Sequence, residues 1–500
     1  MGDPNNNRNT YGGIFKALAL FGGVKIVQII ISIIRSKLIA ILIGPTGIGI
    51  SNLLTSTTNT LNSITGCGLH TSAVREVAKS YNQHLQEDIN RTITTLRGLT
   101  WLTGLVGAIL VLAFAKPLSI FAFGNSDYTA AFRILSIMMV FMQINVGQTA
   151  LLQGCFHYKD MARATVEGQM LSLVLTVPLY YFFREKGIVP ALLIASFITV
   201  VMSTIYARRV NYQKVRMTMR EFWQNGKGMI ALGVVIALGG QISNASSYLM
   251  NVIISHLDSV EAVGLYSAAI TMANSYVFLV LSAMTTDYVP RLSAIVGDDK
   301  EQIIVINKQM EMVMMIITPL LIAFMVFARE AILILYSSEF LAVVHMLEFL
   351  MFGMFFRAIS WCLSYAFIAR GDSKIFLMNE SLIFFISLSL KFTGFYFGSY
   401  TGIGIAIILV YVAYCLLMFV VCKHRFKFKL SIGFYKIASA CLGLCGIALA
   451  VSNTGGISWW RYLIGVVTLI LSIVYSYNEL DKRIHISRAL ATRINKSHHE

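Results

Sequence analysis

Long apolar blocks alternate with short polar stretches along the whole chain, and most blocks are long enough to cross a lipid bilayer as a helix. A hydrocarbon core about 30 Å thick requires about 20 apolar residues in a helix, whereas strands of a membrane barrel would alternate over about ten positions. We therefore predict an all-α polytopic membrane protein with about 14 transmembrane helices. The predicted spans are 17–43, 46–66, 98–115, 130–153, 166–183, 187–207, 229–254, 262–286, 310–328, 343–368, 376–397, 402–422, 434–452 and 459–477.

The composition agrees with this prediction and excludes several classes of protein. The chain is 56% hydrophobic and 13% charged, and its mean hydropathy is +0.70. A soluble domain is about one quarter charged. A cytosolic enzyme and a secreted disulfide-rich scaffold are therefore excluded.

The net charge of +16 reflects the distribution of basic residues across the membrane and gives no support for nucleic-acid binding. If the N-terminus is cytoplasmic, most of the 40 Lys and Arg residues fall in cytoplasmic loops and tails. The opposite side holds Lys116, Arg184, Lys186, Arg329 and Arg461. Basic residues favour the cytoplasmic side of membrane proteins. We therefore predict a multi-pass topology with both termini cytoplasmic.

A faint internal repeat divides the chain into two halves. The segment "TGIGIS" (46–51) matches "EAVGLYS" (261–267) at an offset of 215, and "TSAVREVA" (71–78) matches "DYVPRLSA" (287–294) at 216. Parallel repeats of this kind are known in transporters and imply a pseudo-twofold axis along the membrane normal. We predict two pseudo-symmetric six-helix lobes plus two extra C-terminal helices. The predicted parts are an N-terminal lobe (1–207), a basic interfacial linker (208–228), a C-terminal lobe (229–423) and the two extra helices with a basic tail (424–500).

The predicted linker combines basic and apolar residues. Val215, Met219, Phe222 and Trp223 follow helical spacing, and Arg and Lys residues surround them. A basic amphipathic helix of this kind lies on anionic lipid. We therefore expect an interfacial helix here and membrane lipids as partners.

Polar residues recur at helical spacing inside several predicted spans. Such residues are costly in a bilayer and normally face the protein interior or a wet cavity. The candidate substrate-binding residues on these faces are Lys25, Arg35, Lys37, Asn52, Asn59, Asn62, Gln241, Asn244, Arg357 and Lys391. Small residues on the same stripes are more often packing seams, and Asn or Gln can form hydrogen bonds between helices instead.

The charged members of these stripes favour an anionic ligand. Lys25, Arg35, Arg357 and Lys391 lie too deep to reach the interface comfortably, although Lys37 can snorkel. Acidic partners are few in the spans. The nearest, Glu311 and Glu348, are candidates for ion coupling.

Two further basic residues occupy equivalent positions in the repeat. Arg75 and Arg291 lie at the predicted cytoplasmic ends of helices. A role in substrate entry or lobe gating is about as well supported as a role as positive-inside anchors or salt bridges between lobes.

No pattern in the chain indicates catalysis, a metal site or a cofactor. Paired carboxylates, a Ser/His/Asp set and a Walker-type nucleotide loop are absent from the sequence. Cys441 and Cys445 share a helix face without a His or carboxylate, so the interpretation as buried hydrophobes is favoured over a metal site. We therefore predict a permease without catalytic residues rather than an enzyme. Arg and Lys suit phosphates, and the Asn-rich second helix suits sugar hydroxyls.

Four segments resemble the Wzx-type O-antigen translocases, and most closely the lipid III flippase branch of the multidrug/oligosaccharidyl-lipid/polysaccharide exporter superfamily. They are "LIAILIGPTGIGISNLLTSTTNTLNSITGCGLHTSAVREVAKSYNQ", "FGNSDYTAAFRIL", "DYVPRLSAI" and "ILYSSEF". The resemblance implies a flippase that moves an undecaprenyl-pyrophosphate-linked oligosaccharide from the inner to the outer leaflet of a bacterial inner membrane. It implies alternating access between two lobes, with the polysaccharide polymerase and chain-length machinery as candidate partners. Such translocases usually have twelve helices, and the extra pair here resembles the lipid II flippases.

Two alternative functions remain open from the sequence. A multidrug or organic-cation exporter of the same superfamily should have buried acids in its cavity, whereas this chain has buried bases. A membrane-embedded glycan polymerase or ligase should have a substantial outer loop with catalytic residues, and the predicted outer loops are short.

Overall fold

The computed structural model describes residues 4–82, 86–453 and 459–484. The side chains of residues 4–26, and of some positions in α8, α9 and α13, are not described. Every described element is a helix, turn or bend, and no strand occurs among the described residues. The prediction of an all-α protein is therefore confirmed.

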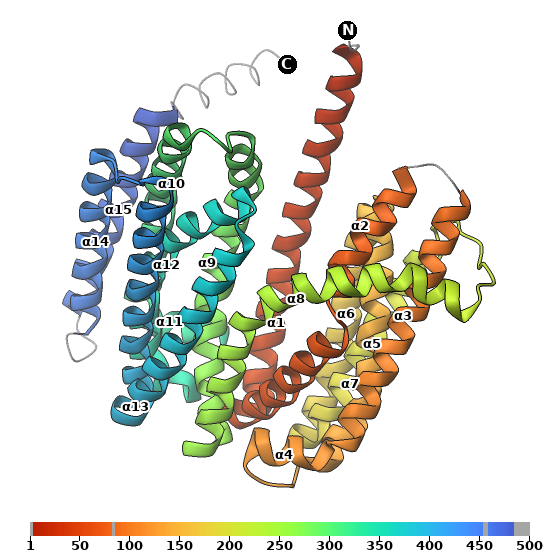
Figure 1. Ribbon diagram of the computed structural model, residues 1–500. Coiled ribbons are helices and arrows are strands. Elements are labelled where there is room, and N and C mark those ends of the chain that lie inside the picture. Colours follow the sequence, from red (N-terminus) through yellow and green to blue (C-terminus); the bar gives the residue numbers. More distant parts are fainter. Residues whose placement is uncertain (1–3, 83–85, 454–458, 485–500) are drawn as a thin grey trace, which may run out of the picture. The chain divides into compact units, whose positions relative to one another are not determined.

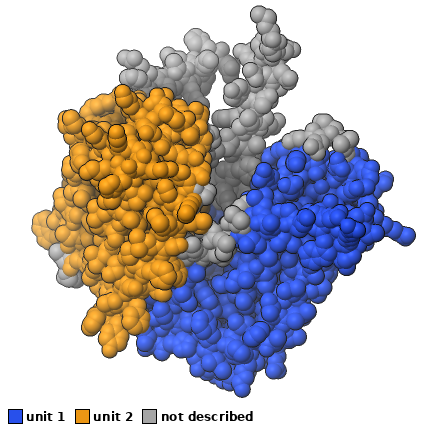
Figure 2. Space-filling view, viewed as in Figure 1, with its two compact units in different colours: residues 1–267, 335–337 blue, residues 268–334, 338–500 orange. Residues whose placement is uncertain are grey.

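The chain divides into two compact units, residues 1–267 with 335–337 and residues 268–334 with 338–500 (Figure 2). The domain boundaries predicted from the sequence, after residues 207, 228 and 423, stay a prediction. In the first unit, α3 packs on α5, and α5 and α6 both pack on α7 (Figure 1). Its helices are α1 (Pro4–Thr65), α2 (Leu69–Asn82), α3 (Gln86–Ala113), α4 (Ala115–Phe123), α5 (Thr129–Gly154), α6 (Tyr158–Phe183), α7 (Ile188–Ala207) and α8 (Met219–Leu257).

Helix α9 (Val260–Ala294) begins in the first unit and continues into the second. In the second unit, α12 packs against α13 and α10, and α10 also contacts α14 and α15 (Figure 1). The remaining helices are α10 (Asp299–Val326), α11 (Ala328–Leu335), α12 (Val344–Arg370), α13 (Ser373–Phe426), α14 (Ile432–Ser452) and α15 (Trp459–Ile484).

Ten stretches of the described chain are long and apolar enough to span a membrane. Three of them hold two predicted spans each: Val27–Thr65, Tyr158–Ala207 and Lys374–Phe426. These ten stretches therefore correspond to thirteen of the fourteen predicted spans, and the remaining one, 229–254, lies within α8. The structure thus agrees with the apolar blocks in the sequence.

In two of the three stretches, a single residue with non-helical backbone angles separates the paired spans, and in the third the 3-10 helix Arg184–Gly187 separates them. Gly44 breaks α1 with a φ of 63° and a ψ of −169°, and Pro45 follows it. Positive φ is readily accessible to glycine, and proline starts a new helical segment without needing its missing N–H. In α13 the break falls at Ser399, with a φ of 50°.

The linker is helical only in part, which corrects the predicted interfacial helix. Residues 211–218 form no helix, and α8 begins at Met219. The N–H groups of Gln213 and Val215 donate to Asn90 Oδ1 (2.9 Å) and Thr94 Oγ1 (3.3 Å) on α3, so they are not available for a helix. Thr218 then caps α8 in a reciprocal capping box with Glu221. These hydrogen bonds lower the pKa of the Glu221 carboxyl.

Candidate functional site

A polar cluster forms in the second unit where α9, α12 and α13 meet. The guanidinium of Arg357 on α12 donates to Asn274 Oδ1 on α9 and to Tyr411 Oη on α13 (3.1 Å). It also lies 5.4 Å from the centre of the Tyr411 ring, within range of a cation–π interaction. Neutral partners therefore hold Arg357 in a defined orientation.

A second cation, Lys391, lies close enough to Arg357 for the two charges to repel. Lys391 belongs to the first half of α13, before the break at Ser399. The halves of α13 meet at Gly394 and Gly402, where a Cβ on Gly402 would stand 1.9 Å from the carbonyl oxygen of Gly394. Only residues without a side chain permit this approach, which brings the Lys391 half against the half that carries Tyr411.

Glu380 is an acid of this region that sequence reasoning missed. Tyr414 Oη donates a hydrogen bond to the carboxylate of Glu380. Tyr414 also lies close enough to Arg357 to interact with its charge. Glu380 and Lys391 are eleven positions apart on α13, which places them on one face of the helix. This spacing in the sequence could have indicated that Glu380 belongs to the same face as Lys391. No carboxylate forms an ion pair with Arg357 or Lys391 among the described side chains.

The cations of the first unit are separate from this cluster in the chain and have their own partners. Arg35 is half-buried on α1 and interacts with the phenol of Tyr180 on α6. Lys37 donates from Nζ to the carbonyl oxygen of Tyr336. Lys37 is therefore held by the protein rather than extended toward an interface.

The three asparagines of the α1 stripe differ in their surroundings. Asn62 accepts a hydrogen bond from Gln143 Nε2 on α5 through Oδ1 (2.9 Å) and through its carbonyl oxygen (3.1 Å). Its contact therefore matches the alternative of a hydrogen bond between helices. Asn52 is half-buried and Asn59 is exposed.

The remaining predicted residues are two exposed arginines and three residues whose side chains are not described. Arg75 on α2 and Arg291 on α9 are both exposed, and Arg291 has an interaction partner. Lys25 lies on α1, and Gln241 and Asn244 lie on α8, but the side chains of these three fall outside the described part of the structure.

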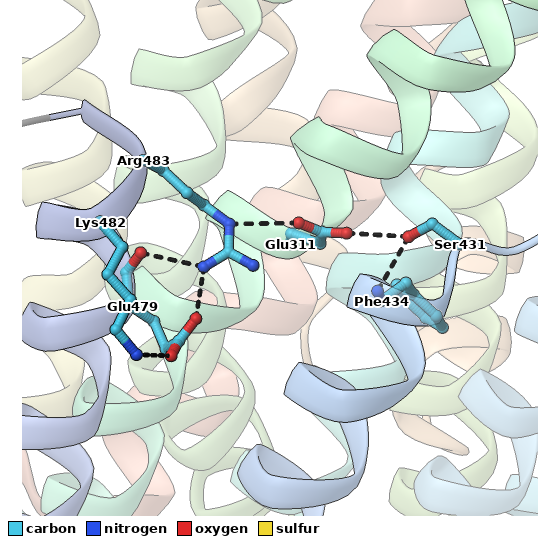
Figure 3. Close-up of polar contacts among 6 residues, drawn as sticks. All are labelled: Glu311, Ser431, Phe434, Glu479, Lys482 and Arg483. Carbon is cyan, nitrogen blue, oxygen red and sulfur yellow. Dashed lines mark hydrogen bonds and ion pairs between the residues drawn. The ribbon is translucent and has the colours of Figure 1, made fainter.

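Glu311 on α10 contacts the C-terminal helices rather than the cations of the cluster (Figure 3). Its Oε1 accepts from Ser431 Oγ (2.8 Å), and its Oε2 lies 3.3 Å from Nε of Arg483 on α15. Ser431 is the N-cap of α14 and also accepts from the N–H of Phe434 (2.9 Å). Glu311 therefore lies at the positive end of the α14 dipole and beside a cation.

Glu348 on α12 forms a second attachment of α15. It is fully buried, and it pairs with Arg461 Nη2 (2.6 Å) and with Nδ1 of His345 (3.0 Å). Arg461 lies near the start of α15 and Arg483 near its end. Both acids thus tie the two extra helices to α10 and α12, and their ion-coupling role stays a prediction.

Helices α1 and α9 cross at a pair of glycines related by the internal repeat. A Cβ on Gly49 would stand 1.9 Å from the carbonyl oxygen of Val260, and one on Gly264 would stand 1.9 Å from that of Pro45. An offset of 215 turns Pro45 and Gly49 into Val260 and Gly264. Gly49 therefore contacts the repeat equivalent of Pro45, and Gly264, the equivalent of Gly49, contacts Pro45 itself. Such reciprocity is typical of an isologous contact around a twofold axis.

No group of three or more potential metal ligands occurs among the described residues. The class of protein follows from the long apolar helices and the half-buried polar cluster among them. It is a multi-pass membrane transporter.

Comparison with known proteins supports this class. The sequence of residues 38–345, more than half of the chain, matches the family described as polysaccharide biosynthesis protein. The chain belongs to this family. The lipid III flippase of Escherichia coli (strain K12) is 21% identical over 417 residues, which cover 80% of this chain and 96% of that protein. The lipid III flippase of Shigella flexneri matches equally well. The predicted family resemblance is therefore confirmed, and the chain is a transporter rather than an enzyme.

Solved structures show the same fold. The lipid II flippase MurJ in an inward closed conformation matches with a TM-score of 0.70, at 14% identity, over 94% of this chain and 99% of that one. An inward-facing multidrug resistance MATE family transporter of the MOP superfamily matches with a TM-score of 0.66, at 14% identity, over 79% of this chain and 94% of that one.

Proposed function

We propose that this protein is a flippase that moves an undecaprenyl-pyrophosphate-linked oligosaccharide from the inner to the outer leaflet of a bacterial inner membrane. The relatives named lipid III flippase and the MurJ fold support a lipid-linked oligosaccharide as the substrate class. O-antigen or a similar repeat unit is the finer assignment. Both termini are cytoplasmic in this proposal, and the polysaccharide polymerase and chain-length machinery are the expected partners.

The observation that carries this proposal is the pair of cations in the membrane, Arg357 and Lys391. Their repulsion is unfavourable, and no carboxylate pairs with either among the described side chains. Charges inside a membrane are costly unless a partner or water compensates them. A diphosphate supplies the missing negative charge and accepts hydrogen bonds from guanidinium and ammonium groups. The site therefore favours an anionic substrate over an organic cation.

The remaining polar residues have proposed roles around the same substrate. We propose that Arg35 and Lys25, both on α1, also contact the diphosphate. Asn52, Asn59, Asn62, Gln241 and Asn244 are proposed to contact sugar hydroxyls, with Asn62 exchanging its bond to Gln143. Arg75 and Arg291 are proposed to receive the headgroup at entry, and Glu311 and Glu348 remain the candidates for ion coupling.

In this proposal, the binding site opens first to the inner leaflet and then to the outer leaflet, while the polyprenyl tail of the substrate stays in lipid. With a negative cell interior, moving about two negative charges outward gains about 4–5 kcal/mol per 100 mV. Motion of the bound cations with the substrate would reduce this gain.

The proposal is tested by leaflet transfer in proteoliposomes. A fluorescent undecaprenyl-pyrophosphate oligosaccharide is incorporated, and an impermeant quencher reports its exposure. We expect transfer by the wild type and a loss of at least tenfold in Arg357→Gln. A matched control, Lys308→Gln/Lys374→Gln, removes two exposed cations of the same unit and should retain transfer.

Two results would contradict the proposal. One is the absence of transfer of any lipid-linked glycan, with or without an imposed potential. The other is transport of a fluorescent organic cation by the wild type, which would identify a multidrug exporter instead. Joining of sugars by the purified protein would point to a polymerase or ligase.

A further inference from the structure

The segment between α7 and α8 forms one wall of a pocket against α3. Its non-helical residues are fixed to α3 by the hydrogen bonds of Gln213 and Val215, and Met217 Sδ accepts from Thr95 Oγ1 (3.8 Å). Phe222 at the start of α8 packs against Leu99 and Met229 in a small core. Contacts at both ends therefore hold the wall in place.

The pocket has a volume of about 910 Å³, which is within the range of small-molecule sites. Three cations line it, Arg97, Lys214 and Arg216, and the residues that line it include no acid. The aromatic rings of Trp101, Tyr212 and Trp223 form much of the remaining wall. The lining of the pocket thus combines positive charge with apolar and aromatic surface.

Arg97 has hydrogen-bonding capacity that its protein partners do not use. Its guanidinium lies 4.6 Å from the centre of the Tyr212 ring, and Nη2 makes one long hydrogen bond to Gln148 Oε1 (3.5 Å). Its Nε is buried without any hydrogen-bond partner. A buried donor left unpaired costs about 1–3 kcal/mol. A bound anion would remove that cost.

The apolar surface of the pocket continues from Trp101 along the exposed face of α3. Trp101 is 52% exposed, Leu105 48% and Ile109 64%. These positions recur every four residues, so they form one stripe along a helix long and apolar enough to span the membrane. An occupant can therefore have a charged end in the pocket and an apolar end on this stripe.

We propose that this pocket binds the phosphate headgroup of an anionic membrane phospholipid, with an acyl chain along the α3 stripe. Three cations without an acid favour a net negative headgroup over a zwitterionic one. The Tyr212 and Trp rings suit the boundary between headgroup and hydrocarbon. A free phosphate would use the cations but leave the apolar wall uncovered.

The test measures lipid binding to the full-length protein by native mass spectrometry from detergent, with phosphatidylglycerol and phosphatidylcholine as probes. We expect the wild type to retain one phosphatidylglycerol in preference to phosphatidylcholine. Arg97→Gln should weaken that binding about tenfold. Lys214→Gln/Arg216→Gln should weaken it similarly, and because both side chains are exposed this variant does not disturb packing. The matched control is Arg220→Gln/Lys227→Gln, which removes two exposed cations that do not line the pocket.

Several results would overturn the proposal. Equal retention of the two lipids would do so, as would unchanged binding in both pocket variants or an equal loss in the control. Displacement of phosphatidylglycerol by an equimolar amount of undecaprenyl pyrophosphate would assign the pocket to the substrate. Complete displacement by millimolar inorganic phosphate would assign it to a free anion.

Discussion

Two sets of charged residues lie among the helices of the second unit, and they differ in how their charge is balanced. Glu348 is fully buried and pairs with Arg461 at 2.6 Å. Arg357 is held by the neutral side chains of Asn274 and Tyr411, with Lys391 nearby as a like charge. The paired set joins helices, whereas the second set has unbalanced positive charge that an anionic ligand can neutralise.

The contact of Glu311 with Arg483 is intermediate between these two sets (Figure 3). Its carboxylate is buried at the start of α14, but the Arg483 side chain is 30% exposed and shares its charge with Glu479. A charged residue in a span therefore does not by itself indicate a binding site. Residues whose charges are balanced within the protein attach helices to one another, and residues whose charges are not balanced are candidates for binding a ligand.

The largest expected effect follows from breaking the buried pair. Glu348→Gln leaves Arg461 without its charged partner, and removing one member of a buried pair costs about 3–5 kcal/mol. Unfolding of the purified protein in detergent measures this loss. The double variant Glu348→Gln/Arg461→Gln should recover much of it. A loss below about 1 kcal/mol in the single variant would contradict the attachment role.

An uncharged contact shows how much stability depends on packing alone. Gly49→Val places a side chain against the backbone of Val260 and should cost about 1–3 kcal/mol through overpacking. Gly264→Val should cost a similar amount, because the two contacts are related by the repeat. In the control Gly443→Val the new Cβ meets no atom within 4 Å. Thermal unfolding compares the three variants, and an unperturbed Gly49→Val would disprove the close crossing.

The intermediate contact should give an intermediate loss. Glu311→Gln removes the charge at the start of α14, where an anion contributes up to about 2 kcal/mol in partly buried geometries. Arg483 keeps Glu479 as a partner, so we expect a loss of about 1–2 kcal/mol. Limited proteolysis between α14 and α15, together with thermal unfolding, reports the change. A loss as large as that of Glu348→Gln would contradict the proposed gradation.

The unbalanced site should respond differently from both attachments. Arg357→Gln removes the hydrogen bonds to Asn274 and Tyr411 but also relieves the repulsion with Lys391, so we expect a stability change within about 1 kcal/mol. The same unfolding measurement applies. A loss of about 3 kcal/mol or more would show that Arg357 is a structural residue and would remove the distinction between the two sets.

The smallest effect is expected at the exposed edge of the Glu311 region. The Lys482 side chain is 69% exposed and forms an ion pair with Glu479 at 2.7 Å. Exposed pairs contribute about 0–1 kcal/mol. Lys482→Gln should therefore leave the unfolding temperature almost unchanged, and a clear decrease would show that this pair is part of the attachment.

The fold could be predicted from the sequence because each helix that crosses a bilayer requires a long apolar segment. The repeat offset of 215 also anticipated that Gly49 and Gly264 are equivalent, although it did not predict that they touch. The helical spacing at Val215 and Met219 was misleading. The N–H groups of Gln213 and Val215 donate instead to Asn90 and Thr94, more than a hundred positions away, and residues 211–218 form no helix.

The site could be predicted only in part, because its partners come from distant parts of the chain. Arg357 and Lys391 were expected from their charge at membrane depth. Asn274 lies 83 positions from Arg357 and Tyr411 lies 54 positions away, and no local pattern connects them. Glu348 was identified as an acid in a span, but its partner Arg461 is 113 positions away and comes from a helix outside the repeat.

The central claim is that Arg357 and Lys391 hold the pyrophosphate of a lipid-linked substrate. The most direct measurement is the affinity of the purified protein for undecaprenyl pyrophosphate in nanodiscs. The wild type is compared with Arg357→Gln/Lys391→Gln and with Lys308→Gln/Lys374→Gln. The account predicts that the first variant binds at least tenfold more weakly while the second binds like the wild type, both remaining folded. Equal affinity in all three proteins would contradict the account.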